Sequence, residues 1–98
     1  MTETRKRAVN LLNESLDATH LNRNRLAKLA GIWNGGVYNA ANGCTTSEYT
    51  VSRMKRVLYE HLMLRREDLE RDLSLVNSLL ARIERDELRG LCELGEQD

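Results

Sequence analysis

The side chains in this chain of 98 residues that are best suited to specific contacts are amides, and they gather in one short stretch. Their spacing places the following residues on one face of a helix: Asn34, Gly35, Tyr38, Asn39 and Asn42. An asparagine amide both donates and accepts hydrogen bonds, so Asn39 or Asn42 could pair with adenine through two bonds. Tyr38 could touch a thymine methyl group or a phosphate, whereas Asn42 also has the residue type of a helix cap. The stretch has no Arg or Lys, so the bidentate guanine contact is excluded there.

Cations lie on both sides of this stretch and predict phosphate contacts from Arg23, Arg25, Lys28, Arg53 and Lys55. The formal net charge is zero, but residues 1–66 hold eleven Lys and Arg against five Asp and Glu, a surplus of six positive charges. Residues 67–98 have the opposite excess, with four Arg against ten acids. This asymmetry favours contact between the basic part and nucleic acid, although chance segregation of solvated charges is the alternative.

Two short helices joined by a tight turn would position these side chains. Asn22 is a good cap for a helix over 23–30, and Gly31 suits the left-handed conformation that ends it. A second helix over 34–42 would turn Val37 and Ala40 inward and leave the amides outside, as in a helix-turn-helix whose second helix enters the DNA major groove. The alternative is a β-hairpin, because IWNGGVY has strand-like residues around Asn-Gly.

The stretch from Leu21 to Leu58 resembles the phage-repressor and Cro-like helix-turn-helix regulators. The resemblance is carried by LNRNRLAKLAGI, then VYNAANG, and then a capped helix. It implies that the five residues of the amide face contact bases or adjacent phosphates and that Arg23 grips a phosphate. Trp33 and the glycine pair after it depart from the family pattern, which has polar residues at these positions.

The flanking segments also have helical patterns. Apolar residues over 5–17 predict an amphipathic helix, whose basic start at 5–7 either binds phosphate or is simply solvated. Thr45 and Glu48 have the spacing of a capping box. Since neither Gly nor Pro follows until Gly90, residues 47–89 could form one helix of about forty residues or two helices broken near 61–66.

The C-terminal part has a heptad pattern that predicts dimerisation through a seam of apolar residues: Leu69, Leu73, Val76, Leu80 and Ile83. We therefore expect a DNA-binding domain over 1–62, and a coiled-coil-like dimerisation segment over 63–98 with a loose tail from Leu91. Two alternatives are that the seam folds back on its own chain, or that it binds a partner other than DNA.

Composition indicates an all-α protein, because the chain has no Phe or Pro and its apolar residues are mostly aliphatic. No catalytic set can be picked out, so we expect no enzyme activity and no cofactor. Cys44, Cys92, His20 and His61 lack the spacing of metal ligands, which indicates free thiols and no metal. The absence of a signal peptide and of a long apolar run predicts a cytoplasmic location without a membrane contact. The expected function is a sequence-specific, homodimeric transcriptional regulator that binds double-stranded DNA, a repressor of phage, plasmid or mobile-element type.

Overall fold

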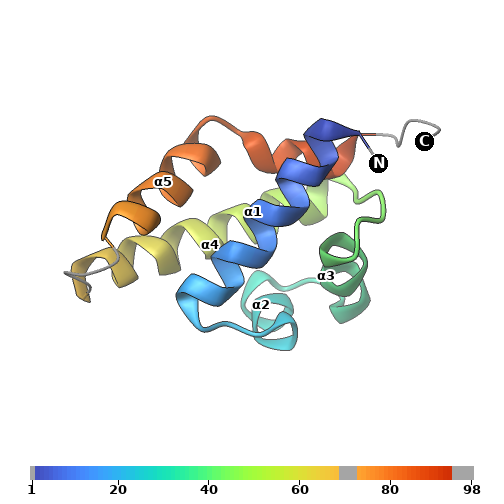
Figure 1. The fold of residues 1–98 in the computed structure, drawn as a ribbon. Helices are drawn as coiled ribbons and strands as arrows, with labels where there is room; N and C mark the ends of the chain where they lie inside the picture. The colour runs from blue at the N-terminus through green and yellow to red at the C-terminus, as the bar shows by residue number, and fades with distance from the viewer. Residues whose placement is uncertain (1, 69–72, 94–98) are drawn as a thin grey trace.

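A computed structural model describes residues 2–68 and 73–93 of the chain. Within these residues the protein is all-helical, as predicted, and no strand is present. Figure 1 shows the six elements: α1 (Glu3–Thr19), α2 (Arg23–Ala30), α3 (Asn34–Ala41), α4 (Glu48–Asp68), α5 (Leu73–Glu84) and the 3-10 helix η1 (Glu87–Cys92). None of the helices in the described part combines the length and the apolar composition needed to cross a membrane.

Helix α1 forms where the sequence predicts an amphipathic helix. The hydroxyl of Thr2 accepts a hydrogen bond from the backbone N–H of residue 5 and so caps its first turn. Ala8, Leu12 and Leu16 recur every four residues and are buried against the rest of the chain. His20 ends the helix in the left-handed conformation, with φ of 58°.

The start of α4 differs from the predicted capping box. The Ser47 hydroxyl, not that of Thr45, accepts from the backbone N–H of Thr50 at 3.2 Å. Thr45 instead accepts a hydrogen bond from the buried guanidinium of Arg5, which also donates to the Gly43 carbonyl at 3.2 Å. Arg5 therefore ties α1 to the connection between α3 and α4 and is not available to a phosphate.

The C-terminal part does not form the single long helix that was one of the two predictions, and it does not break near 61–66 either, because α4 continues to Asp68. It forms two helices, and α5 packs against α4, α1 and η1 of its own chain. Val76, Leu80 and Ile83 of the predicted seam are at most 3% exposed, while Leu73 is 38% exposed and Leu69 lies outside the described residues. The seam is therefore used inside the chain, and dimerisation through it would require α5 to leave the core. Of the three arrangements considered for this segment, namely a dimer, folding back on the same chain and binding another partner, folding back is the one observed.

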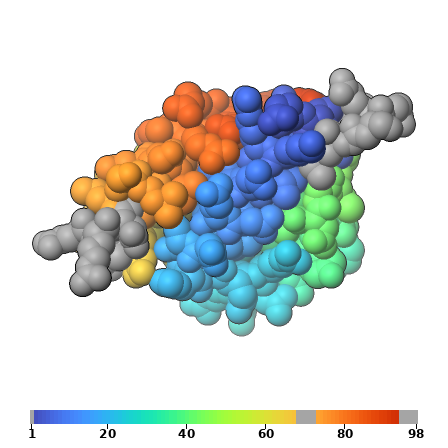
Figure 2. Space-filling model, in the orientation of Figure 1, coloured from blue at the N-terminus to red at the C-terminus, as the bar shows by residue number. Residues whose placement is uncertain are grey.

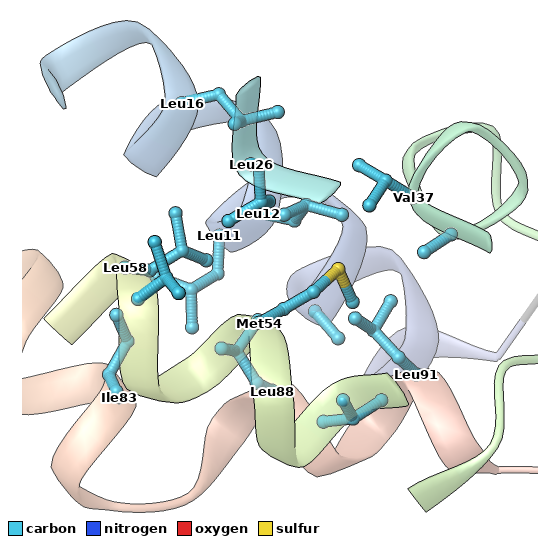
Figure 3. Packing of buried hydrophobic residues seen from close by; sticks show 14 of the residues in the cluster. Leu11, Leu12, Leu16, Leu26, Val37, Met54, Leu58, Ile83, Leu88 and Leu91 are labelled. Carbon is cyan, nitrogen blue, oxygen red and sulfur yellow. The ribbon is translucent and has the colours of Figure 1, made fainter. Parts of the chain in front are cut away.

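One cluster of aliphatic side chains joins all six elements (Figure 3). Leu62, at the predicted domain boundary, lies within α4, and the cluster includes residues from both sides of it. The prediction of a loose tail from Leu91 is wrong at its start. Leu91 is fully buried, and its carbonyl accepts a hydrogen bond from the Thr46 backbone N–H at 2.9 Å. Figure 1 shows α5 and η1 above α4 and the α2–α3 pair below it, so the candidate site lies away from the C-terminal helices.

Candidate nucleic-acid interface

The two short helices of the candidate site begin and end where the sequence predicts. The side chain of Asn22 accepts from the backbone N–H of Arg25 at 2.7 Å, which caps α2. Gly31 ends α2 with φ of 68°, a conformation that costs glycine little. After residues 31–33, α3 follows as a helix, which excludes the β-hairpin alternative for this stretch.

The inner sides of α2 and α3 are built from small and branched residues, so the two helices pack closely. Leu26, Ala27 and Ala30 of α2 and Val37 and Ala40 of α3 are all buried. Alanine at positions 27, 30 and 40 leaves room for close backbone approach. This packing determines which side of α3 faces outward.

The predicted contact residues lie on the outer side of α3. Asn34, Tyr38 and Asn39 are exposed, and Gly35 is partly exposed between them. Asn42 is also exposed and is the C-cap residue of α3, with its backbone N–H directed at the carbonyls of the last turn. In the space-filling view, α2 and α3 form the lower edge of the molecule (Figure 2).

Two of the predicted phosphate-binding cations remain fully at the surface, and a third is held in place by an aromatic ring. The guanidinium carbon of Arg23 lies 4.9 Å from the centroid of the Tyr38 ring, so α2 and α3 are linked at their exposed sides. Arg25 and Lys28 are exposed on α2. Arg23 therefore lies at the outer side of α3, and neither α2 nor α3 contains an acidic residue.

Arg53 is engaged with the protein itself. Its Nε donates to the Ala30 carbonyl at 2.7 Å, which stabilises the C-terminus of α2, and its guanidinium lies 5.7 Å from the Tyr49 ring centroid. Arg53 therefore lies beside the α2–α3 turn but mainly serves to fix it.

Lys55, by contrast, is not brought to the α2–α3 face. Its Nζ donates to the Asp86 carboxylate at 3.0 Å, next to the start of η1. Since η1 packs on α1, α4 and α5, this lysine points to the other side of α4.

A groove of about 880 Å³ runs beside the candidate contact face. It is formed by the C-terminal half of α1, the start of α2 and the first turns of α3, and its lining includes Asp17, Arg23, Asn34 and Tyr38. Asn34, Gly35 and Tyr38 of the predicted contact set therefore form one wall of this groove, and the acidic Asp17 of α1 also lines it.

Trp33 is the residue at this face that sequence reasoning did not assign a contact. It occupies the N-cap position of α3, makes no side-chain cap hydrogen bond and is 75% exposed. The available signal was the position of the chain's only tryptophan directly before the first turn of the second helix. Its indole lies beside Gly35.

Other candidate chemistry is limited within the described residues. No three His, Cys, Asp or Glu side chains come together there as a metal site would require. Cys44 and Cys92 are free thiols, and partial burial raises the pKa of Cys92, which disfavours its thiolate.

Comparisons of the chain with models of protein families, with curated proteins and with solved structures found no match. The proposal below therefore depends on the residues themselves.

Proposed function

We propose that this protein binds double-stranded DNA through α2 and α3, as a helix-turn-helix transcriptional regulator that acts as a repressor. The observation that carries the proposal is the outer side of α3. Its polar and aromatic residues are exposed and its inner side is packed, Arg23 lies against Tyr38, and α2 exposes two further cations. An exposed helix of this composition next to cations suits the DNA major groove, which admits one α-helix.

The chemistry of the outer side supports A·T recognition. The side-chain amide of Asn39 can donate a hydrogen bond to N7 of adenine and accept one from the N6 amino group. α3 contains no Arg or Lys that could read guanine. Tyr38 is held over Arg23 and so reaches the duplex with its orientation already restricted. The preference for particular base pairs would therefore come mainly from Asn39 and Tyr38.

Affinity would come chiefly from Arg23, Arg25 and Lys28. Each can contact a phosphate, and such contacts release counterions and make binding strongly dependent on salt. Arg5 and Lys55 are excluded from this set because their charged groups bond to other parts of the chain. The alternative of a partner bound through the C-terminal seam has less surface to use, because Val76, Leu80 and Ile83 of the seam are buried in the chain's own core.

The sequence predicts dimerisation only through the C-terminal seam, most of which is buried in this chain, so a dimer would need another surface or the release of α5. A dimer would place two α3 helices on an inverted repeat with half-sites about 34 Å apart. Light scattering of the purified chain with and without duplex measures this directly. A complex of one chain with one half-site would contradict the predicted dimer and would agree with DNA binding.

The proposal is tested by two double variants that each remove two positive charges. Arg25→Ala with Lys28→Ala removes cations of the proposed interface, whereas Lys55→Ala with Arg56→Ala removes cations that pair with Asp86 and Glu60. Fluorescence anisotropy of a labelled duplex across a salt series measures affinity. We expect the first pair to weaken binding and to lower the slope against salt by about two.

The control pair should leave that slope nearly unchanged. Equal weakening by both pairs would show that net charge, not the α2 surface, controls binding. No binding by the unaltered chain at low salt would remove the DNA proposal altogether.

Base reading is tested separately with Asn39→Ala. Selection of bound sequences from random duplexes first defines the preferred site. Asn39→Ala should then lose discrimination between that site and random DNA by about 1–3 kcal/mol, whereas Arg23→Ala should weaken binding to both similarly. The same loss of discrimination in both variants would contradict the assigned roles.

A further inference from the structure

We propose that Trp33 is a base-contacting residue, and that its indole ring packs on the methyl group of thymine in the major groove. This inference depends on the DNA-binding function proposed above. It adds a residue to the interface beyond the amides, the cations and Tyr38 that the sequence predicts.

The argument begins with the space above Gly35. A Cβ atom built on Gly35 would lie 2.4 Å from Cζ2 and Cη2 of Trp33 and 2.7 Å from its Cε2. No real Cβ approaches carbon atoms so closely, so the six-membered part of the indole occupies the position that a side chain at residue 35 would take. The indole can therefore occupy this position only while residue 35 has no side chain, and a Cβ there would make the ring turn away.

This position belongs to the outer side of α3. Residues three and four apart are neighbours on a helix surface, so Gly35 shares its side with Tyr38 and Asn39. The indole therefore extends the exposed face formed by Tyr38 and Asn39 toward the start of the helix. The helix-turn-helix regulators that this stretch resembles have polar side chains at the start of the second helix, whereas this chain has a flat apolar ring there.

The exposed ring has no structural role that the described residues reveal. The buried hydrophobic residues of the described part are aliphatic, apart from the thioether of Met54, and Trp33 is 75% exposed. A Ser, Asp or Asn at the cap would satisfy a free backbone N–H of α3, which Trp33 does not do. Glycine at residue 35 also weakens the helix relative to alanine. The start of α3 therefore lacks both a side-chain cap at residue 33 and a good helix former at residue 35, and it exposes an indole ring instead.

The surroundings of the ring favour DNA over a protein partner. α2 and α3 together carry three cations and no acid, which complements a polyanion. In the major groove, thymine presents a methyl group as its distinguishing apolar feature. An apolar ring at the start of α3 can cover that methyl group, and Asn39 one turn further on can pair with adenine, so the two contacts would read the same A·T-rich sequence.

Two 20-base-pair duplexes test this assignment: alternating dA–dT, and alternating dA–dU, which lacks only the thymine methyl groups. Anisotropy of an end-labelled duplex at about 50 mM salt reports binding. In parallel, emission from Trp33, the chain's only tryptophan, reports contact at this residue on unlabelled duplex. We expect the emission to be quenched on binding and the dA–dT duplex to bind about fourfold more tightly than dA–dU, the effect of burying about one methyl group.

Variants at the two residues complete the test. Trp33→Ala should still bind DNA but should bind both duplexes equally, whereas Trp33→Phe should keep part of the preference. Gly35→Ala should also reduce the preference, because its Cβ displaces the ring. Circular dichroism should show the same helicity and melting for Trp33→Ala, since the ring is exposed.

The outcomes separate this inference from the proposed function. Binding by anisotropy with unchanged tryptophan emission would overturn the role of Trp33 and leave DNA binding by α3 in place. Quenching without a preference for dA–dT would overturn the thymine assignment. Failure to bind either duplex would overturn both proposals, and docking of Trp33 to a protein partner would then be the remaining explanation for the exposed ring.

Discussion

Gly90→Ala tests how closely the C-terminal 3-10 helix is packed on α1. A Cβ atom at residue 90 would lie 2.6 Å from the Thr4 carbonyl oxygen and 3.0 Å from the Ala8 Cβ. The carbonyl belongs to the backbone of α1, so relief requires η1 and α1 to move apart by more than half an ångström. Overpacking of this kind costs about 1–3 kcal/mol of stability.

The same substitution at Gly36 is the matched control. A Cβ there meets only Thr50 Cγ2, at 3.6 Å, which is an ordinary contact. Both changes restrict the unfolded chain by about 0.4–1 kcal/mol in favour of folding. Gly36→Ala also gains helix propensity, so it should be stabilising, while Gly90→Ala should remain destabilising by about 1–2 kcal/mol after this offset.

Thermal unfolding followed by circular dichroism gives both results. For a chain of this size, about 1 kcal/mol corresponds to roughly 4–8 °C in Tm. Gly90→Ala should lower Tm by about 5–15 °C and Gly36→Ala should raise it by a few degrees. A Gly90→Ala variant as stable as the unaltered chain would refute the close packing of η1 on α1, and with it the single core.

Three further predictions concern other contacts. Leu80→Asp should unfold the chain, not yield a folded monomer, because it buries a charge in the core, and circular dichroism measures this. Arg53→Ala should lower stability by about 1 kcal/mol in urea unfolding, because the Ala30 carbonyl loses its donor. Hydrogen bonds from Arg82 hold the pKa of Glu87 below its ordinary value of 4.5, so Glu87→Gln should cost about 1 kcal/mol at pH 7.

The sign of the pH effect follows from that lowered pKa. Between the folded and unfolded pKa values of Glu87, the unfolded chain binds more protons, so the stability from the Arg82 pair is complete above the unfolded value and is lost as pH falls through the folded one. Glu87→Gln should therefore reduce the decline of stability in acid. An identical decline in both proteins would contradict this account, as would a folded, helical Leu80→Asp monomer.

The parts of the fold that could be predicted from sequence are those that local chemistry determines. Asn22 and Gly31 have residue types that favour helix caps. The buried sides of the two helices, with Leu26 and Ala30 on α2 and Val37 on α3, can be recognised without knowing the tertiary contacts. The helix bounds and the exposed side of α3 followed from these signals. The hairpin alternative failed because α3 packs its small residues on a helical neighbour.

The parts that could not be predicted depend on contacts between distant residues. A heptad seam has the same pattern whether it meets a second chain or its own α4, so Val76 and Leu80 did not reveal which surface they would cover. Lys55 looked free until Asp86, thirty-one residues later, was placed beside it. Likewise, nothing near Arg5 in the sequence indicates that its guanidinium bonds to Gly43.

The central claim is that the outer side of α3 contacts DNA, and amide chemical shifts of the isotope-labelled chain test it most directly. On titration with a short duplex at low salt, the signals of residues 33–42 and of the first turn of α2 should move most. Those of α5 and η1, on the other side of α4, should move least. Large shifts confined to α5 and η1, or no shifts anywhere, would contradict the account.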